Sequence, residues 1–425
     1  MSFEFRWNEY ADQPHNVGLR KERFRYHLKH TGSYFSLAGS NLKRAFPVLS
    51  LYRKYRKRMY KEPVSLGSPF ALSVSPHKEK PDEVLDLLRE TGVRKTLVRV
   101  PSWEKEKLDE YEKFFERLHQ DGCEVTAALL QQRDDVVDPL KWQEFLEEVY
   151  ARLKESASYF EIGHAWNRTK WGLWNYKEYL QLALTALDLS EKYRLEIIGP
   201  AVIDFEFHLY APVLDAVLFD KVSSLLYVDR MGAPENKQSG WDTSKKVALL
   251  KAVIDGTCRR ERDLWITEVN WPLEGTGKYS PAAGKPNVSE EEQADYMVRY
   301  YILCLASGFV ERIYWWQLVA PGYGLVDSRE KPWRKRPGYY AFQTMVGLLE
   351  GSTFTEKVAH PQALIFSFQK GEESFSVCWT NEEPCDHVFE NRIVRVLSRD
   401  GKEIPVKDNR VKIDGSPKYV FFEKG

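Results

Sequence analysis

The chain has 425 residues, with 62 lysines and arginines balanced by 62 aspartates and glutamates. This length leaves room for additions at both ends of a barrel of ~250 residues, and the even charge argues against a protein that binds nucleic acid over its whole surface. The five cysteines are odd in number and widely spaced, which favours free thiols in a reducing compartment over a disulfide framework.

The amino terminus has no apolar stretch of the kind that marks a secretory signal. No run of about 18 apolar residues is present that would span a bilayer. The histidines and cysteines lack the spacings of zinc sites, and no Gly-rich phosphate loop of the nucleotide-hydrolysing type occurs. We therefore expect a cytoplasmic protein with no metal and no other cofactor.

The first 65 residues are strongly basic. They hold 14 Lys and Arg against 5 Asp and Glu, so this segment carries +9 and the remaining 360 residues carry −9. Within residues 41–61 the basic side chains alternate with aromatic and aliphatic ones. Such a segment can lie on an anionic membrane, at the inner face, or on a phosphorylated glycolipid, or it can pack across the rest of the protein with one solvated side. Pro47 is expected to interrupt a single long helix.

From residue 66 to residue 351 short apolar runs alternate with amphipathic helical patterns, which is typical of repeated βα units. The expected strands are residues 70–74, 96–100, 123–130, 159–163, 195–202, 222–228, 264–269 and 312–318. Helices are expected from residue 81 and at 108–120, 142–153, 176–192, 244–255, 290–307 and 338–349. Eight such units predict an α/β fold, a (β/α)8 TIM barrel. An open doubly wound sheet would carry a Gly-rich turn after its first strand, which is absent.

From residue 352 to residue 425 the pattern changes to short alternating strands with turns at Gly371, Gly401 and Gly415. The expected strands are residues 363–368, 375–380, 393–397, 411–413 and 419–422. This segment is predicted to form a β-sandwich domain packed against the barrel.

The carboxyl ends of the predicted barrel strands are rich in tryptophan. In a (β/α)8 barrel these ends carry the reacting groups, and indole rings suit the stacking of sugar rings. Tryptophans on or after the strands are Trp103, Trp166, Trp171, Trp174, Trp241, Trp271, Trp315 and Trp316. Further candidates for substrate binding at strand ends are Asn167, Tyr227, Asp229 and Gln317. The alternative for any single tryptophan is ordinary packing in the core or in a loop.

Glu268 closes the seventh predicted strand. A carboxylate at this place among aromatic rings is well positioned to attack or stabilise an oxocarbenium-like centre. Arg99, at the end of the second strand, is expected to pair with it and favour its charged form. The alternative for Glu268 is a surface salt bridge at a strand end.

Two segments carry a resemblance to a known family. YFEIGHAWN at residues 159–167 resembles the strand-four signature of clan A glycoside hydrolases, especially family 39 and its relatives, whose form is Phe-Glu-Ile-Gly-Asn-Glu-Pro-Asn. LWITEVNWP at residues 264–272 resembles their strand-seven nucleophile segment. The resemblance covers roughly residues 66 to 425 and implies a retaining glycoside hydrolase with Glu268 as nucleophile. Where the family has His-x-Tyr on strand six, only Tyr227 remains.

The resemblance also implies that the acid/base is missing. In the family, the second residue of the Asn-Glu pair is the general acid/base, and here the pair reads His164-Ala165. Glu161 lies four residues before Ala165, about 13 Å deeper at ~3.3 Å per residue, and is too far to substitute. His164, at the family's Asn position, has a reference pKa near 6.5, so it can transfer protons or bind a hydroxyl or phosphate, or simply be a neutral hydrogen-bonded residue.

Three functions remain open at this stage. The donor can be an activated glycoside, such as a glycosyl phosphate, whose leaving group needs no proton. A residue such as His164 or Asp229 can have taken over the acid role. Alternatively, the chain is an inactive glycan-binding or scaffold protein in cell-surface polysaccharide or lipopolysaccharide assembly. In each case the expected partner is a carbohydrate.

Overall fold

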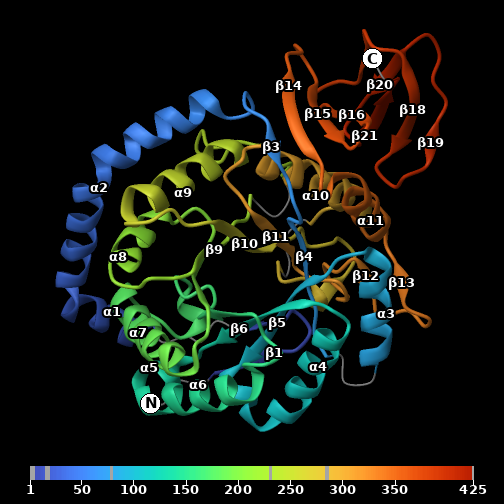
Figure 1. Ribbon diagram of the computed structural model, residues 1–425. Helices are drawn as coiled ribbons and strands as arrows, with labels where there is room; N and C mark the ends of the chain where they lie inside the picture. The colour runs from blue at the N-terminus through green and yellow to red at the C-terminus, as the bar shows by residue number, and fades with distance from the viewer. Residues whose placement is uncertain (1–4, 15–19, 77–79, 229–231, 283–286, 424–425) are drawn as a thin grey trace.

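The computed structural model describes residues 5–14, 20–76, 80–228, 232–282 and 287–423. Eight parallel strands close into a barrel in the order β10-β11-β4-β5-β6-β7-β8-β9 (Figure 1). Their bounds are β4 (Phe70–Ser73), β5 (Lys95–Pro101), β6 (Glu124–Leu130), β7 (Tyr159–Ile162), β8 (Ile197–Ile203), β9 (Lys221–Leu225), β10 (Leu264–Val269) and β11 (Arg312–Trp315). The predicted TIM barrel is confirmed, and each strand overlaps the apolar run that predicted it.

Helices surround the barrel because the longer ones have an apolar stripe to bury against the strands. They are α3 (Pro81–Thr91), α4 (Leu108–Gln120), α5 (Arg133–Val137), α6 (Pro139–Leu153), α7 (Tyr176–Tyr193), α8 (Tyr210–Leu214), α9 (Thr243–Thr257), α10 (Glu290–Leu305) and α11 (Pro337–Leu349). Local signals fix where they begin: the Asn175 side chain caps α7, and Ser289 with Glu292 forms a capping box at α10. The connection from β8 to β9 contains only the short α8 and one 3-10 turn.

The carboxyl-terminal domain contains a seven-stranded antiparallel sheet in the order β19-β18-β21-β16-β15-β14-β3 and a two-stranded sheet of β17 and β20. The strands are β14 (Thr353–Val358), β15 (Leu364–Lys370), β16 (Glu373–Trp379), β17 (Cys385–Val388), β18 (Ile393–Ser398), β19 (Glu403–Ile404), β20 (Arg410–Ile413), β21 (Lys418–Phe422) and β3 (Val64–Ser65). One apolar cluster, which includes Ile365, Val396 and Ile413, lies between the two sheets. The other face of the larger sheet packs against the barrel core through residues such as Phe366 and Trp379.

The strand β3 precedes the barrel in sequence but pairs with β14 at the edge of the carboxyl-terminal sheet. The chain therefore contributes one strand to the carboxyl-terminal sheet before it forms the barrel. The two-stranded β12 (Val326–Asp327) and β13 (Arg334–Lys335) form a separate ribbon.

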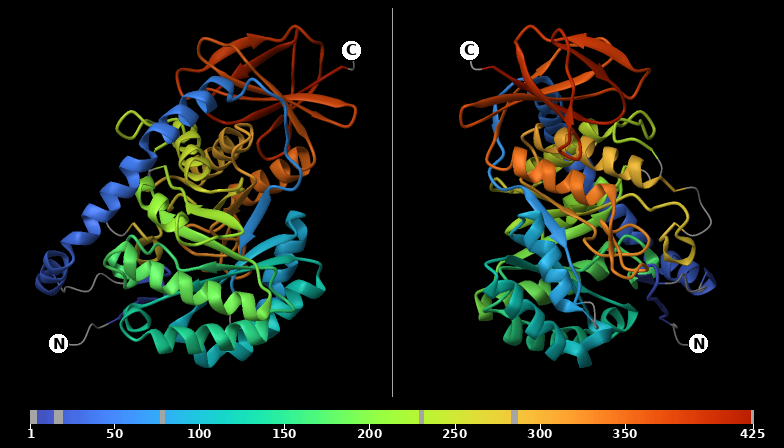
Figure 2. Two further views of the ribbon diagram at one scale, coloured as in Figure 1. Left: turned by 60° about the vertical axis from the view of Figure 1, so that its left-hand side comes forward. Right: turned by 90° about the vertical axis from the view of Figure 1, so that its right-hand side faces the viewer.

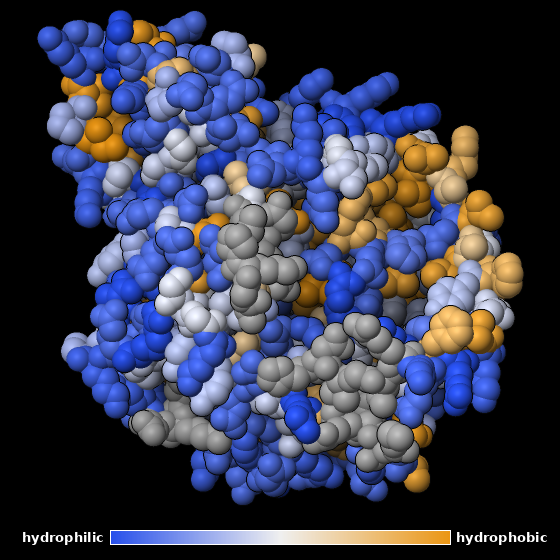
Figure 3. All heavy atoms as spheres, turned by 180° about the vertical axis from the view of Figure 1, so that it is seen from behind, coloured by the Kyte–Doolittle hydropathy of each residue, from blue (hydrophilic) through white to orange (hydrophobic). Residues whose placement is uncertain are grey.

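The amino-terminal segment crosses the outside of the barrel. A hairpin of β1 (Trp7–Asn8) and β2 (Gln13–Pro14) is followed by α1 (Arg20–Lys29) and by α2 (Thr31–Arg58). Figure 2 shows α2 as a long rod running obliquely past the barrel toward the carboxyl-terminal domain, and it contacts α8 and α9. From behind, apolar atoms gather along the edge of the molecule where α2 runs (Figure 3).

The prediction that Pro47 interrupts this helix is wrong, because α2 continues through it. The helix is anchored on both sides of the proline: the Arg44 guanidinium pairs with Asp215 at 2.5 Å, and the Tyr55 hydroxyl donates to Asp255. These contacts compensate for the main-chain hydrogen bond that proline cannot donate. Among the described residues, no helix is at once long and apolar enough to cross a membrane.

Candidate active site

Glu268 reaches the barrel interior through a bulge in β10. The pairing of β10 with β11 runs from Ile266 with Ile313 to Val269 with Trp315, so β10 holds one extra residue. A bulge of this kind turns a side chain that strict alternation would point to the other face of the sheet. The Glu268 side chain is only 8% exposed, and it lines a cavity at the carboxyl end of the barrel.

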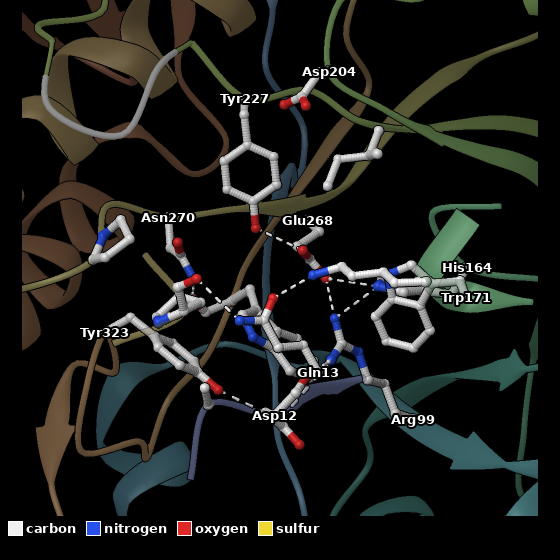
Figure 4. Close-up of a pocket in the computed structure, with 16 residues that line it drawn as sticks. Asp12, Gln13, Arg99, His164, Trp171, Asp204, Tyr227, Glu268, Asn270 and Tyr323 are labelled. Carbon is white, nitrogen blue, oxygen red and sulfur yellow. Dashed lines mark hydrogen bonds and ion pairs between the residues drawn. The ribbon is translucent and has the colours of Figure 1, made fainter. Parts of the chain in front are cut away.

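Both carboxylate oxygens of Glu268 accept hydrogen bonds (Figure 4). The Tyr227 hydroxyl, just beyond β9, donates to Oε1 at 2.6 Å, and the Arg99 guanidinium, on β5, donates to Oε2. Arg99 is itself fixed, because its guanidinium lies 3.4 Å from the ring centroid of Trp316. The predicted pairing of Arg99 with Glu268 is present in this arrangement.

His164 lies beside this pair, after the sharp turn at Gly163, whose φ is +76°. A side chain at position 163 would meet the Tyr179 ring at 2.9 Å, so glycine is required there. The Gln131 amide binds both main-chain groups of His164, accepting from its N–H at 2.9 Å and donating to its carbonyl at 3.1 Å. The ring therefore projects into the cavity from a fixed backbone.

The His164 ring is a neutral acceptor. Its Nε2 accepts from the Arg99 guanidinium at 2.9 Å and lies 3.5 Å from Glu268. Burial, together with the positive charges of Arg99 and Lys170, holds the pKa of His164 well below its usual value. The ring is therefore neutral, and its Nε2 bears no proton because it accepts from Arg99, so this geometry argues against His164 as the missing acid.

Ala165, at the family's acid/base position, is fully buried. Its φ is +41°, and its N–H donates to the carbonyl of Ala201 at 3.1 Å. The methyl group lies in the apolar cluster inside the barrel that also contains Trp171. This position supplies neither a proton nor a charge.

Glu161 lies on β7 inside the barrel and does not line the cavity. It is 1% exposed, and its Oε1 has no hydrogen-bond partner among the residues that the structure describes. Burial raises its pKa to about 7, the side chains of Thr267 and Ser223 act in the opposite direction, and the nearby charge of Glu268 raises it further. Glu161 is thus a buried acid beneath the site.

The amino-terminal hairpin supplies one wall of the cavity, which no sequence pattern indicated. Asp12 accepts from the Gln317 amide at 3.1 Å, and its main-chain carbonyl accepts from Arg99 at 3.2 Å. Gln13 accepts from the Lys170 ammonium at 2.5 Å. The cavity has a volume of about 100 Å³. Its lining residues not foreseen as ligands are Ala11, Asp12, Gln13, Lys170, Ile203, Asp204, Asn270, Pro272, Pro281 and Tyr323.

The same hairpin covers part of the tryptophan rim. The Trp7 ring lies 5.1 Å from Trp103 and 6.0 Å from Trp171, and Phe5 lies 4.6 Å from Trp103. Trp171 and Trp316 line the cavity, whereas Trp103 does not. Part of the surface that was predicted to stack on sugar is therefore occupied by the chain itself.

Three predicted sugar-binding tryptophans belong to the core instead. Trp166 stacks on Tyr179, and Trp271 stacks on Trp315. All three tryptophans are at most 2% exposed, and none of them lines the cavity. Trp315, on β11, points outward from the barrel because side chains alternate along a strand. Trp166 and Trp271 follow β7 and β10 and pack in the same apolar core.

The remaining candidates are dispersed. Asn167 binds the main chain of Ile203 with both ends of its amide, at 2.9 and 3.0 Å, and so fixes the end of β8. Gln317 does not line the cavity itself but donates to Asp12, which does. Asp229 lies outside the described residues. Among the residues that the structure does describe, no group of three or more His, Cys, Asp or Glu side chains is arranged to hold a metal ion.

The fold is similar to that of solved glycoside hydrolases. A family 39 glycoside hydrolase from Bacteroides cellulosilyticus WH2 superposes with a TM-score of 0.66 at 16% identity, over 84% of this chain and 81% of that one. A family 30 endoxylanase from Clostridium papyrosolvens C71 gives 0.57 at 12%, over 85% and 98%. A family 51 arabinofuranosidase from Xanthomonas axonopodis pv. citri gives 0.54 at 14%, over 85% and 97%. No protein-family model and no curated protein sequence matches the chain. At these identities the likeness concerns the fold.

Proposed function

We propose that this chain is a retaining glycosidase-like or transglycosidase-like enzyme that acts on a β-linked glycan or an activated glycoside. The observation that carries this proposal is the placement of Glu268, which the β10 bulge turns into a cavity at the carboxyl end of the barrel, between two hydrogen-bond donors. A carboxylate fixed in this way is suited to attack an anomeric carbon. The fold shared with solved glycoside hydrolases supports the same reading.

The first step forms a bond between a Glu268 oxygen and the anomeric carbon while the bond to the leaving group breaks. The oxygen of a water or of a second sugar's hydroxyl then bonds to the anomeric carbon as the bond to Glu268 breaks. Its proton passes to solvent, and the Glu268 carboxylate is restored. Ala165 cannot protonate the leaving group, and His164 is a neutral acceptor. The donor that suits this site therefore has a leaving group that departs as an anion, such as a phosphate. Lys170 and Arg99 supply positive charge in the cavity to receive such a group.

The nucleophile is tested by trapping. Intact mass is measured after incubation with a panel of 2-fluoro glycosides that carry activated leaving groups, which need no acid. We expect one sugar to add covalently to the native protein and to the control variant Glu206→Gln, whose carboxylate pairs with Arg168 outside the cavity. Glu268→Gln should give no adduct. An adduct that persists in Glu268→Gln would refute Glu268 as the nucleophile.

The missing acid is tested with aryl glycosides of the trapped sugar. Without a proton donor, the rate of glycosylation should fall steeply as the leaving group becomes more basic. A rate that hardly changes across the series would mean that another group in the cavity donates a proton.

A catalytically inactive glycan-binding or scaffold protein is the second candidate. The contacts of Glu268 favour this second function, because Arg99 and Tyr227 engage both carboxylate oxygens. The hairpin favours it as well, because it narrows the cavity. Calorimetric binding of a glycan, with no adduct from any activated sugar and no turnover, would decide for this function. The five free thiols support our proposal that either function is carried out in a reducing compartment.

A further inference from the structure

The outer side of α1 and α2 is an apolar surface. Six side chains there are between 52% and 84% exposed: Phe24, Leu28, Phe35, Leu42, Phe46 and Leu49. We call these six residues the outer apolar face. Soluble proteins scatter single apolar residues over their surfaces, but a contiguous set of large ones marks a surface that binds something. The same region shows as the apolar edge in Figure 3.

Helical geometry places the α2 members of this face on one line. Residues 35, 42, 46 and 49 are separated by seven, four and three positions, which are the spacings of one helix side. The opposite side of α2 is held by the barrel: Val48 and Tyr55 pack on the core, and the Asn41 amide donates to the carbonyl of His208 at 2.8 Å. The helix is thus firmly docked with its inner side, and the apolar residues point away from the protein.

The charge of this segment is one-sided. Residues 23–61 contain 11 Lys and Arg and no Asp or Glu. On the helix line that carries Phe46 and Leu49, the next outward positions are Arg53 and Lys57, and both are exposed. The surface is therefore apolar along its first part and cationic at its end.

We propose that the outer apolar face docks the protein on the surface of an anionic lipid bilayer. Phe and Leu side chains enter the boundary between headgroups and acyl chains, while Arg53 and Lys57 bind headgroup phosphates. A second copy of this chain is a poor occupant, because pairing the face with itself would bring two sets of like charges together. A bilayer supplies an apolar layer for the phenylalanine and leucine side chains and negative charge for the basic ones.

The docked orientation brings the cavity close to the lipid. Arg23 of α1 donates to the Thr169 hydroxyl at 2.8 Å, and the next residues, Lys170 and Trp171, line the cavity. If the proposed function holds, this placement favours a saccharide carried on a lipid anchor. The docking itself does not depend on that function, since it rests on α1 and α2 alone.

Sedimentation with vesicles tests the proposal on the full-length protein. The native chain should sediment with phosphatidylglycerol-containing vesicles at least about tenfold more strongly than with pure phosphatidylcholine, and high salt should weaken this binding. The triple variant Phe35→Ser, Leu42→Ser, Phe46→Ser should lose at least about tenfold in the same assay. The control Val388→Ser, Val394→Ser, which removes exposed apolar side chains from β17 and β18 of the carboxyl-terminal domain, should sediment like the native protein.

A second variant separates charge from apolar contact. Arg53→Gln with Lys57→Gln should reduce the preference for anionic over neutral vesicles while leaving the thermal melting curve unchanged. Native protein that stays in the supernatant with anionic vesicles would overturn the proposal. So would a triple variant that binds like the native chain, or concentration-dependent self-association that the triple variant abolishes without any vesicle binding, because the face would then bind protein.

Discussion

Glu161 makes the stability of the barrel depend on pH. Its pKa rises from 4.5 to about 7 on burial, so the folded protein binds this proton more tightly than the unfolded chain does. The favourable contribution of the protonated side chain is complete below pH 4.5 and is lost as the pH rises through about 7. Since one pKa unit corresponds to about 1.4 kcal/mol, the unfolding free energy should fall by about 3 kcal/mol over this interval through Glu161 alone.

The substitution Glu161→Gln removes the titrating proton and keeps the shape of the side chain. Urea unfolding of the native and variant proteins is measured at several pH values between 4.5 and 8. We expect the free energy of Glu161→Gln minus that of the native protein to rise by about 3 kcal/mol toward pH 8, because all other titrating groups are common to both. The control Glu196→Gln, at an exposed position, should parallel the native protein. Two parallel curves for Glu161→Gln and the native protein would refute the argument.

Four further substitutions test local geometry. Gly172→Ala would bring a Cβ to 2.5 Å from a main-chain nitrogen of α5 at a φ of +96°, and should cost more than about 2 kcal/mol in urea unfolding; Gly277→Ala, at a φ of +55° with open space around it, should cost about 1 kcal/mol. Tyr227→Phe removes a donor 2.6 Å from Glu268 and should slow adduct formation about tenfold with the fold intact; an unchanged rate would contradict the proposed role. Trp7→Ala should speed hydrogen exchange in residues 7–14, and unchanged exchange would mean that the ring does not hold the hairpin.

Much of the fold could be predicted because the apolar residues of long strands and helices recur at regular intervals in the sequence. The strand at 264–269 and the helix at 108–120 have the bounds that the apolar pattern indicated. β3 and the strands of the amino-terminal hairpin are two residues long and show no period, so only tertiary contacts define them. The continuity of α2 through Pro47 depends in the same way on its contacts with the barrel.

Within the site, the sequence predicted which residues lie at the strand ends, but it did not predict the direction in which their side chains point. Arg99 and Glu268 were expected to meet because the carboxyl ends of parallel strands share one edge of the barrel. Trp315 and Trp316 are neighbours in sequence, yet one faces the helices and the other the cavity, since direction alternates along a strand. Asp12 was missed because its contact with Gln317 spans 305 residues.

The position of the hairpin at residues 7–14 affects where the protein can be truncated or tagged for experiments. A fragment trimmed to the barrel at residue 66 would lack Asp12 and Gln13, and an affinity tag fused before residue 5 would be attached a few residues from the cavity. A tag after the carboxyl-terminal sheet lies on a different domain (Figure 1). A negative assay on a shortened preparation would therefore describe an incomplete cavity, and one on an amino-terminally tagged preparation would describe a cavity with added chain near its wall.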